Sequence, residues 1–390
     1  MPPASVDPER IIGAWSSPLK GTLRGLPIEL VPTDALWDAQ NVTVRNALLR
    51  ERPGITRILD TTMSGRPTGA LTLSASGAGA FQVDTFQADA FQETSNSPGA
   101  LLIIGTTTKI YALQGSALNE ISGTTLTALN HHLARFTQIE IASVIQTLHT
   151  NGVDTPRSWD GAAATFSAIG GTPPLWTDFC GAADRGIGIV PPYDIFWGNA
   201  LSLATWPAAN TRSLADTVDP LRAIRPQGTL GVTVYKARSL WAGVQTGGTN
   251  ASYFRFEFRG FFDGPAGPAA VVSVDGVDYY MTETGRLASY DGSTFTWVGD
   301  GVWPVIRAEI DPAYVNQTFG VYDPFNREIT FYYPRTGDAG ELKGAVVLIP
   351  AKPAEGIEEV IAFPWRMGLA VSAGCEYRIA GVNKAVLCTS

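Results

Sequence analysis

The feature of this sequence that most restricts its fold is a short hairpin pattern that recurs along the chain. Its clearest copy is segment 278–292, where an apolar strand at 279–281 is followed by a turn at 283–286, a second strand at 287–290 and an Asp-Gly turn. Gly and Asp-Gly reach turn conformations that other residues adopt only at an energetic cost, so the segment predicts a tight β-hairpin.

Six copies of the pattern occur, each with an apolar strand, a turn and a second strand that ends in an aromatic residue before a glycine turn. These aromatic residues are Tyr111, Trp159, Trp197, Trp241, Tyr290 and Tyr333. They lie 48, 38, 44, 49 and 43 residues apart. Such a period is typical of a β-propeller blade, which is one four-stranded sheet. The sequence therefore predicts an all-β, six-bladed β-propeller. A large β-sandwich or two stacked barrels would have similar strand density without the period.

Composition supports an all-β fold, and the chain divides into three expected regions. Only 16% of residues are charged, with 41 Gly and 26 Pro, which suits many strands and turns. We expect an N-terminal arm at 1–65, the propeller at 66–355 and C-terminal strands at 356–390 that close or flank it. A Phe-Gln motif that recurs at Phe81, Phe86 and Phe91 predicts a loop insertion at about 80–93.

Charge and cysteine content exclude several classes of protein. The net charge of −8 argues against a broadly basic surface for nucleic acid. Cys180, Cys375 and Cys388 form neither a paired framework nor a CxxC motif, so we expect no disulfide scaffold and no structural zinc site. The first residues do not resemble a signal peptide, and the longest apolar stretch, 100–104, is too short to span a bilayer. We therefore expect a soluble protein made in a cytoplasm.

The sequence offers little that could carry catalysis. Its histidines are His131, His132 and His149, and adjacent residues in a strand point to opposite faces, which makes the first two a poor metal pair. No nucleophile-elbow, P-loop or zinc-protease motif is present. We expect no enzyme activity, catalytic residue, cofactor or metal.

A sugar-binding or sugar-cleaving propeller is the alternative. Cleavage needs two carboxylates, for which the candidates are Asp263, Asp275, Asp278, Asp291 and Asp323. Most of them adjoin Gly or Pro, where turn formation explains them. Sugar binding could use the faces of Trp159, Trp197 and Trp241, although an aromatic residue repeated in every blade is more simply part of the core between blades.

Basic residues lie in or just after the hairpin turn in five of the six copies. They are Lys109, Arg157, Lys236, Arg238, Arg286 and Arg327. If all copies share one orientation, these residues form a basic ring on one face, suited to an acidic partner or to guiding DNA. Solvated charges that serve only the turns are the simpler alternative.

The segment 39–54 predicts a second kind of hairpin, with a turn at 45–47 and a Pro-Gly end. Its Asn41-Val42, Leu48-Leu49-Arg50 and Arg52-Pro53-Gly54 resemble the N-terminal motif of tail nozzle, or tail tubular, proteins of short-tailed bacteriophages. Segments 228–241, 290–292 and 321–331 are similar too. We take Asn41, Arg52, Pro53 and Gly54 as the assembly motif.

The resemblance implies a protomer that forms a ring, a hexamer, below the portal and head-to-tail adaptor. The ring would form the distal DNA channel and retain the genome until ejection, with no catalytic residues or cofactor. Its partners would be further copies of itself, the adaptor or portal, tail fibres, and viral DNA that passes without sequence-specific binding. The protein would be made in the bacterial cytoplasm and reside in the virion tail. A head-to-tail adaptor or hub component is an alternative within the same resemblance.

Overall fold

The computed structural model describes residues 42–45, 48–51, 62–73, 101–114, 117–141, 144–228, 231–351, 360–379 and 382–389. The expected assembly-motif residues Asn41, Arg52, Pro53 and Gly54 lie outside the described residues, as does the Phe-Gln segment at about 80–93. Between Asn41 and Arg52, the structure describes two strands, β1 (Val42–Arg45) and β2 (Leu48–Glu51). They pair antiparallel and form the expected hairpin.

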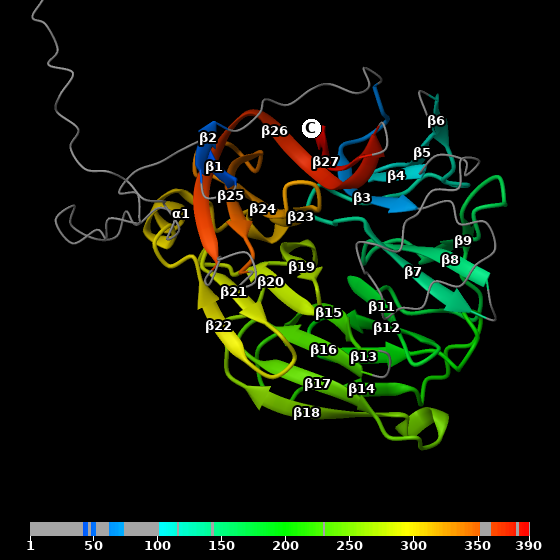
Figure 1. Ribbon diagram of the computed structural model, residues 1–390. Coiled ribbons are helices and arrows are strands. Elements are labelled where there is room, and N and C mark those ends of the chain that lie inside the picture. The colour runs from blue at the N-terminus through cyan, green and yellow to red at the C-terminus, as the bar shows by residue number, and fades with distance from the viewer. Residues whose placement is uncertain are drawn as a thin grey trace, which may run out of the picture.

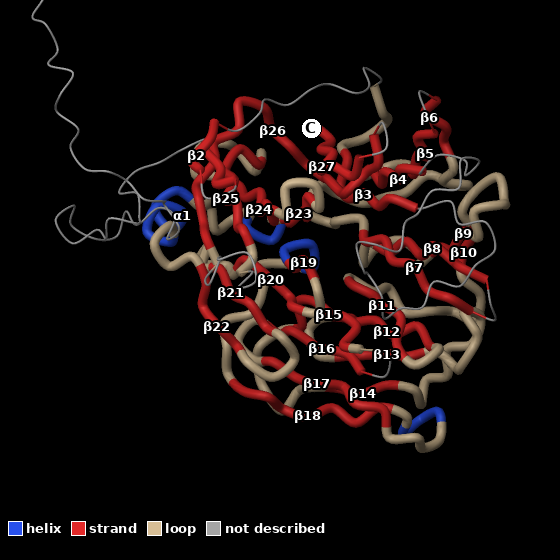
Figure 2. Tube along the Cα trace, viewed as in Figure 1, coloured by secondary structure: helices blue, strands red, loops and turns tan. Residues whose placement is uncertain are grey.

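Six antiparallel sheets lie in a ring, each one the blade of a propeller (Figure 1). Strands dominate the described chain, and the few helical segments lie between them (Figure 2). The six-bladed β-propeller predicted from the repeat is therefore confirmed. A sandwich or a pair of barrels would not give six separate sheets in a ring.

The first three blades follow the chain in order, with strands β3 (Pro67–Leu73), β4 (Leu101–Thr106), β5 (Ile110–Gln114) and β6 (Ala117–Glu120); β7 (Arg135–Ile141), β8 (Val144–Thr150), β9 (Arg157–Trp159) and β10 (Ser167–Ala168); and β11 (Asp178–Ala182), β12 (Arg185–Val190), β13 (Asp194–Trp197) and β14 (Thr211–Ser213).

Blades four to six contain β15 (Leu221–Gln227), β16 (Gly231–Lys236), β17 (Leu240–Gln245) and β18 (Phe254–Gly260); β19 (Val271–Val274), β20 (Val277–Met281), β21 (Leu287–Tyr290) and β22 (Phe295–Val298); and β23 (Phe319–Asp323), β24 (Glu328–Pro334), β25 (Leu342–Ile349), β26 (Ile361–Ile379) and β27 (Val382–Thr389). The helical segments are η2 (Asn250–Ser252), η3 (Pro268–Ala270), α1 (Trp303–Glu309) and η4 (Val315–Gln317).

The first strand of each blade lies nearest the centre of the ring (Figure 1). Neighbouring first strands contact one another, as β7 and β15 do with β11. In a propeller these strands surround a central channel. A residue that directly precedes a first strand therefore lies near one mouth of the channel.

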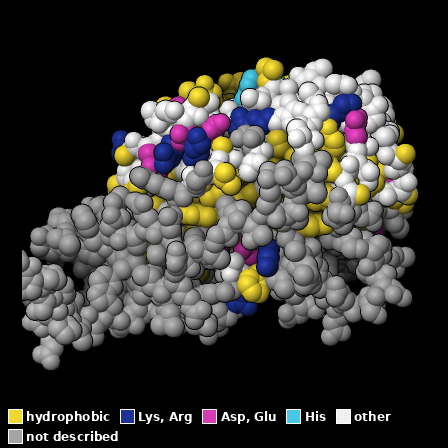
Figure 3. Space-filling view, turned by 90° about the horizontal axis from the view of Figure 1, so that it is seen from above, with side chains coloured by type: hydrophobic (Ala, Val, Ile, Leu, Met, Phe, Trp, Pro, Cys, Tyr) yellow, Lys and Arg dark blue, Asp and Glu magenta, His cyan; other side chains and the backbone are white. Residues whose placement is uncertain are grey.

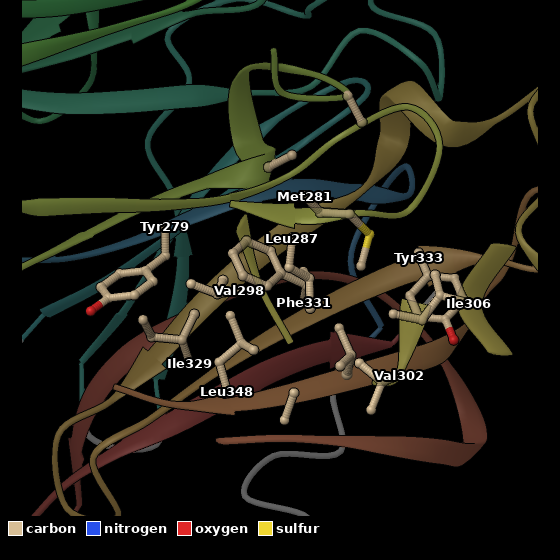
Figure 4. Close-up of a cluster of buried hydrophobic side chains, with 14 of the residues drawn as sticks. Tyr279, Met281, Leu287, Val298, Val302, Ile306, Ile329, Phe331, Tyr333 and Leu348 are labelled. Carbon is tan, nitrogen blue, oxygen red and sulfur yellow. The ribbon is translucent and has the colours of Figure 1, made fainter. Parts of the chain in front are cut away.

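Apolar side chains fill the space between neighbouring blades. Between blades five and six, Met281 and Leu287 pack against Phe331 and Leu348, all four almost completely buried (Figure 4). Trp159 joins the core between blades one and two, where its ring stacks on Phe166. Alternating side chains on both faces of each sheet thus build the cores, which is why the strands are so rich in apolar residues.

The sixth hairpin copy has a different place in its blade from the other five. Copies one to five are the second and third strands, whereas residues 319–333 form β23 and β24, the first and second strands. Tyr333 accordingly lies on a second strand. The β23–β24 turn has a sequence like that of the turns between second and third strands. The reason is that Asp323 closes it by accepting hydrogen bonds from the N–H groups of Phe325 and Asn326. The equivalent turn in blade six is at 335–341.

The C-terminal strands β26 and β27 extend the sheet of blade six. β26 pairs with β25 as the outer strand of blade six and then continues into a hairpin with β27. The second half of β26 lies against β3 of blade one (Figure 1). The hairpin residues Ala373, Tyr377 and Cys388 pack on Leu102 and Ile104. The hairpin is thus inserted between the last blade and the first.

Candidate functional site

The turns between second and third strands share one side of the disc. Strands in each blade alternate in direction, so these turns leave the sheet on the side from which the chain enters the next first strand. Direct contacts confirm this arrangement: Ser64, just before β3, accepts a hydrogen bond from Thr108 in the β4–β5 turn (3.0 Å). Arg66 Nη2 donates to Gly340 O in the β24–β25 turn (3.4 Å). We call this side the turn face.

The predicted basic residues divide between the two sides. Lys109, Arg157, Lys236, Arg238 and Arg286 lie at turns between second and third strands, on the turn face. Arg327 lies between β23 and β24, which places it on the opposite side. The expectation of one shared orientation is therefore wrong for Arg327. Its cause is the shifted place of the sixth hairpin copy.

The basic residues on the turn face are largely neutralised. Lys109 pairs with Glu120 (2.7 Å), and Arg286 pairs with Asp300 (3.1 Å) while its guanidinium lies over the Trp297 ring. On the edge of the ring that the space-filling view shows, Lys and Arg side chains likewise lie next to Asp and Glu side chains (Figure 3). Such pairs leave little positive potential for a distant acidic partner.

Of the other three basic residues on the turn face, Lys236 and Arg157 have local side-chain contacts. Lys236 is fully buried, and its ammonium donates to Leu214 O (2.7 Å) and Thr217 O (2.8 Å). Burial lowers the pKa of Lys236, and nearby Asp219 opposes this effect. Arg157 donates to Ser122 O (3.2 Å), whereas Arg238 is exposed. Lys236 therefore holds a loop in place and cannot meet a partner.

A cavity of about 370 Å³ opens on the turn face. Its described lining residues come from segments before three first strands and from one turn, and they are Arg66, Asn130, His131, Ala313, Tyr314, Asn316, Gln317 and Ala339. Residue 66 precedes β3, residues 130–131 precede β7, and residues 313–317 precede β23. Because first strands surround the channel, this cavity, which we call the axial pocket, lies at one channel mouth.

The axial pocket presents mostly polar groups. Gln317 is only 5% exposed, and its Oε1, which is closed off from solvent, has no hydrogen-bond partner among the described residues. Burial lowers the pKa of Arg66, and the carboxylate of Glu341 opposes this effect. The pocket's described lining contains no carboxylate. It therefore offers hydrogen bonds and a phenol ring, but not the two acids that glycoside cleavage requires.

Sequence reasoning missed most of this pocket. His131 was considered only as a metal ligand, and Arg66, Asn130, Tyr314 and Gln317 were not singled out. They lie in connections between blades, where no motif marks them. What these residues share is their place, because each precedes the first strand of a blade. That place can be recognised only once the first strands have been assigned.

The tryptophans and aspartates considered for sugar chemistry have structural roles. Trp159, Trp197 and Trp241 are all buried in cores, so their faces are not open to a sugar. Asp278 is buried, accepts a hydrogen bond from the Tyr235 hydroxyl (2.6 Å), and has a pKa that burial raises. The side chains of Asp291 and Asp323 accept hydrogen bonds from the backbone of their own turns.

Asp291 shows why the Asp-Gly turns need no ligand. Its Oδ1 accepts hydrogen bonds from the N–H groups of Thr294 (2.7 Å) and Ser293 (2.8 Å). These hydrogen bonds lower the pKa of the Asp291 carboxyl. Gly292 follows with φ of +94°, a conformation that favours glycine. The side chain thus closes the turn.

A second, much smaller cavity lies between blades two and three. It has a volume of about 10 Å³, close to the room that one water molecule needs. His149 and Trp176 line it, and neither His149 Nδ1, His149 Nε2 nor Trp176 Nε1 has a hydrogen-bond partner among the described residues. Burial, with a smaller contribution from Arg157, lowers the pKa of His149 to about 4.

A charged cluster links the inner strands of neighbouring blades. Asp178 on β11 accepts hydrogen bonds from Arg135 Nε on β7 (3.0 Å) and from Arg225 Nη1 on β15 (2.6 Å). The Ile224 N–H donates to the same carboxylate (3.0 Å). Both oxygens of this buried carboxylate therefore accept hydrogen bonds, and the cluster connects blades two, three and four.

The described residues contain neither a metal-binding cluster nor a membrane-spanning helix. No group of three or more His, Cys, Asp or Glu side chains lies close enough together there to hold a metal ion. No helix in that part of the chain is long and apolar enough to cross a membrane.

Comparisons with known proteins identify no family for this chain. No protein-family model matches the chain, and no curated protein matches it. Similar solved structures include a chain of the mitotic checkpoint complex (8% identity, TM-score 0.46, 85% of this chain and 98% of that chain). Others are the WD40 domain of Toxoplasma gondii coronin (8%, 0.45, 85% and 86%) and BBS1N in complex with ARL6DN (10%, 0.48, 84% and 95%). At such low identity a likeness concerns the fold alone, and the blade count rests on the strand order above.

Proposed function

We propose that this protein is a structural component of a tailed-bacteriophage virion, which forms an oligomeric ring at the tail nozzle that channels and retains DNA until ejection. The observation that carries the proposal is the hairpin β1–β2. It forms a two-stranded sheet separate from the six blades, within the segment whose sequence resembles the nozzle motif. A two-stranded hairpin is marginally stable alone; here β1 lies against β26 of the same chain, and a neighbouring protomer would add further contacts.

Ring assembly requires a surface on one protomer that fits a different surface on the next. An N-terminal hairpin that lies outside the propeller sheets is suitable material for such an interface. Six protomers would carry a formal charge of −48 (6 × −8). DNA binding gains free energy when basic side chains neutralise phosphates and release their counterions. An acidic ring makes no such contacts, so DNA can pass through it without adhering.

Ring formation by the purified protein is the direct test of this proposal. We expect negative-stain images of the full chain to show sixfold rings, and sedimentation to give the matching mass. Deletion of residues 1–60 should abolish rings while the circular dichroism of the propeller is retained. As a matched control, deletion of residues 1–38 keeps the hairpin and should keep the rings. Normal rings from the 1–60 deletion would contradict the role of the hairpin.

Two alternatives remain within reach of experiment. An adaptor or hub component would also form rings, and mixing them with purified portal and with purified nozzle-level partners would show which neighbour they bind. A carbohydrate-binding propeller is the second candidate function, and the observation that favours it is the axial pocket. Because the described lining lacks a carboxylate, the pocket favours binding over cleavage.

A further inference from the structure

We propose that the outer edge of blade four pairs with the same edge of a second copy of this chain, so that one antiparallel sheet continues across two protomers. The edge is strand β18, which lies at the rim of the ring and, among the described strands, pairs only with β17 (Figure 1). The proposal does not rest on the tail-ring function, because a twofold contact can join single protomers or complete rings alike.

Strand β18 is longer than the outer strands of the neighbouring blades. The outer strands of blades one, two, three and five have 4, 2, 3 and 4 residues, whereas β18 has 7. An edge strand presents a row of N–H and C=O groups that can pair with another strand, and a short outer strand limits this pairing. Within the described part of these five blades, blade four therefore offers the longest open edge.

Aromatic side chains extend to this edge. Phe258 is 44% exposed, and its ring contacts Trp241 on β17 (5.4 Å between ring centroids) and Phe261 (4.9 Å), which is 73% exposed. Phe254 and Phe256 lie on the same face of β18 as Phe258, because alternate residues of a strand share a face. A second strand at this edge would cover the exposed rings as well as pair with the backbone.

The opposite face of β18 carries a charge pattern that fits its own copy. Arg255, Glu257 and Arg259 alternate along the strand, and both arginines lie against Glu257. In an antiparallel pair centred on Phe256, Arg255 of each copy lies opposite Glu257 of the other copy. A pair centred on Glu257 would instead set Glu257 against Glu257 and Arg255 against Arg259, which like-charge repulsion disfavours.

The backbone independently selects the centre at Phe256. The register of β18 with β17 shifts by one residue at Arg259, which makes Arg259 a bulge. The regular part of the strand is therefore Phe254–Phe258, and its middle residue is Phe256. A pair centred there uses the whole regular segment and places Phe254 of each copy opposite Phe258 of the other. Backbone regularity and side-chain charge thus choose the same register.

The proposed contact is small. A typical stable protein–protein interface buries about 1,600 Å² in total, and the strand segment Phe254–Phe258 of two copies buries less than this. We therefore expect a pair that forms reversibly, which covalent trapping detects better than a measurement of mass alone.

Disulfide trapping in the full chain tests the pairing directly. With Phe256→Cys, the introduced thiols of two copies lie opposite each other at the twofold axis, and a mild oxidant should convert most of the protein to a covalent dimer on a non-reducing gel. Arg212→Cys, on the outer strand β14 of blade three, is the matched control and should remain monomeric on the same gel. Equal, low dimer yields from both variants would overturn the proposal.

Charge reversals test the register. In the Phe256→Cys background, Arg255→Glu sets carboxylates opposite each other and Glu257→Arg sets guanidinium groups opposite each other, so each change alone should lower the dimer yield roughly fivefold or more. Mixing the two variants in equal amounts restores opposite charges across the pair and should restore the yield. A higher yield with Arg255→Glu alone, or an unchanged yield in every variant, would refute the register centred on Phe256.

Two further measurements separate this contact from folding and from ring assembly. If the cysteine variant does not fold, sedimentation of Arg255→Glu, Glu257→Arg and their mixture, with Phe256 intact, should give the same order of association. Identical sedimentation of all three samples would then overturn the proposal. Rings that form without the covalent dimer would refute the β18 contact alone, whereas a covalent dimer without rings would refute the ring and support this contact.

Discussion

At the scale of single residues, His149 is the clearest pH-sensitive group in the described chain. It is 1% exposed and lies beside Phe136, whose ring centroid is 5.1 Å away. The charged neighbours that act on it are Arg157, which disfavours the imidazolium, and Asp154, which favours it. Neither ring nitrogen has a hydrogen-bond partner among the described residues, so no hydrogen bond there stabilises a proton on this ring.

The sign of the pH effect follows from the lowered pKa. The folded protein holds His149 at a pKa of about 4, whereas the ordinary value is 6.5, so between these values the unfolded chain binds more protons. Stability from this group is present above pH 6.5 and is lost as the pH falls toward 4. The loss approaches roughly 3 kcal/mol.

We predict that His149→Leu removes this dependence. Urea unfolding at pH 7.5 and at pH 4 should show that the original protein loses about 3 kcal/mol more than the variant does between the two pH values. His131→Leu, which changes an exposed histidine, is the control and should keep the full loss. Parallel pH profiles for the original protein and His149→Leu would show that His149 does not cause the effect.

At the scale of elements, the hairpin β26–β27 closes the ring. Val371 packs with Phe319 and Tyr332 of blade six, whereas Ala373 and Tyr377 pack on blade one. The same hairpin therefore contributes to two cores, one with blade six and one with blade one. In a simple propeller, the last blade would instead pack directly on the first. Its loss would leave apolar surface of both blades in contact with water.

A matched pair of substitutions on β26 measures this closure. Val371 is 1% exposed and Leu369, two residues earlier, is 54% exposed. We predict that Val371→Asp, which buries an unpaired charge, lowers the free energy of unfolding by more than about 3 kcal/mol. Leu369→Asp should change it by roughly 0.5 kcal/mol or less. The readout is urea denaturation followed by tryptophan fluorescence, and similar losses in both variants would argue against a buried closing hairpin.

The elements also show which features the sequence could predict. Repetition made the fold accessible, because an aromatic residue before a glycine turn recurs at blade length, and five of the six hairpins took the same place in their blades. The copy at 319–333 did not, because Asp323 closes a turn at the other end of a strand with the same local chemistry. The axial pocket escaped prediction for a related reason. Its residues share no motif, and only the closed ring brings Arg66 near Gln317.

At the scale of the whole molecule, charge is distributed so that cations are paired on an acidic protein. The net charge is −8, and the turn-face cations Lys109 and Arg286 each lie against a carboxylate. These pairs are partly exposed and add little to stability. Their consequence is electrostatic, since they remove positive charge from the side of the disc where a basic ring was expected.

The whole-molecule prediction is that the protein does not bind duplex DNA measurably at physiological salt. The double variant with Glu120→Gln and Asp300→Asn frees Lys109 and Arg286 and changes the net charge from −8 to −6 (−8 + 2). Fluorescence anisotropy with labelled duplex DNA should show a gain in affinity for this variant at low salt. The slope of log affinity against log salt should steepen by about 0.9 for each freed cation that reaches a phosphate. Asp184→Asn, which neutralises an exposed carboxylate in the β11–β12 turn without freeing a paired cation, is the control and should bind like the original protein. Salt-sensitive DNA binding by the unaltered protein would contradict a ring that DNA traverses without adhering.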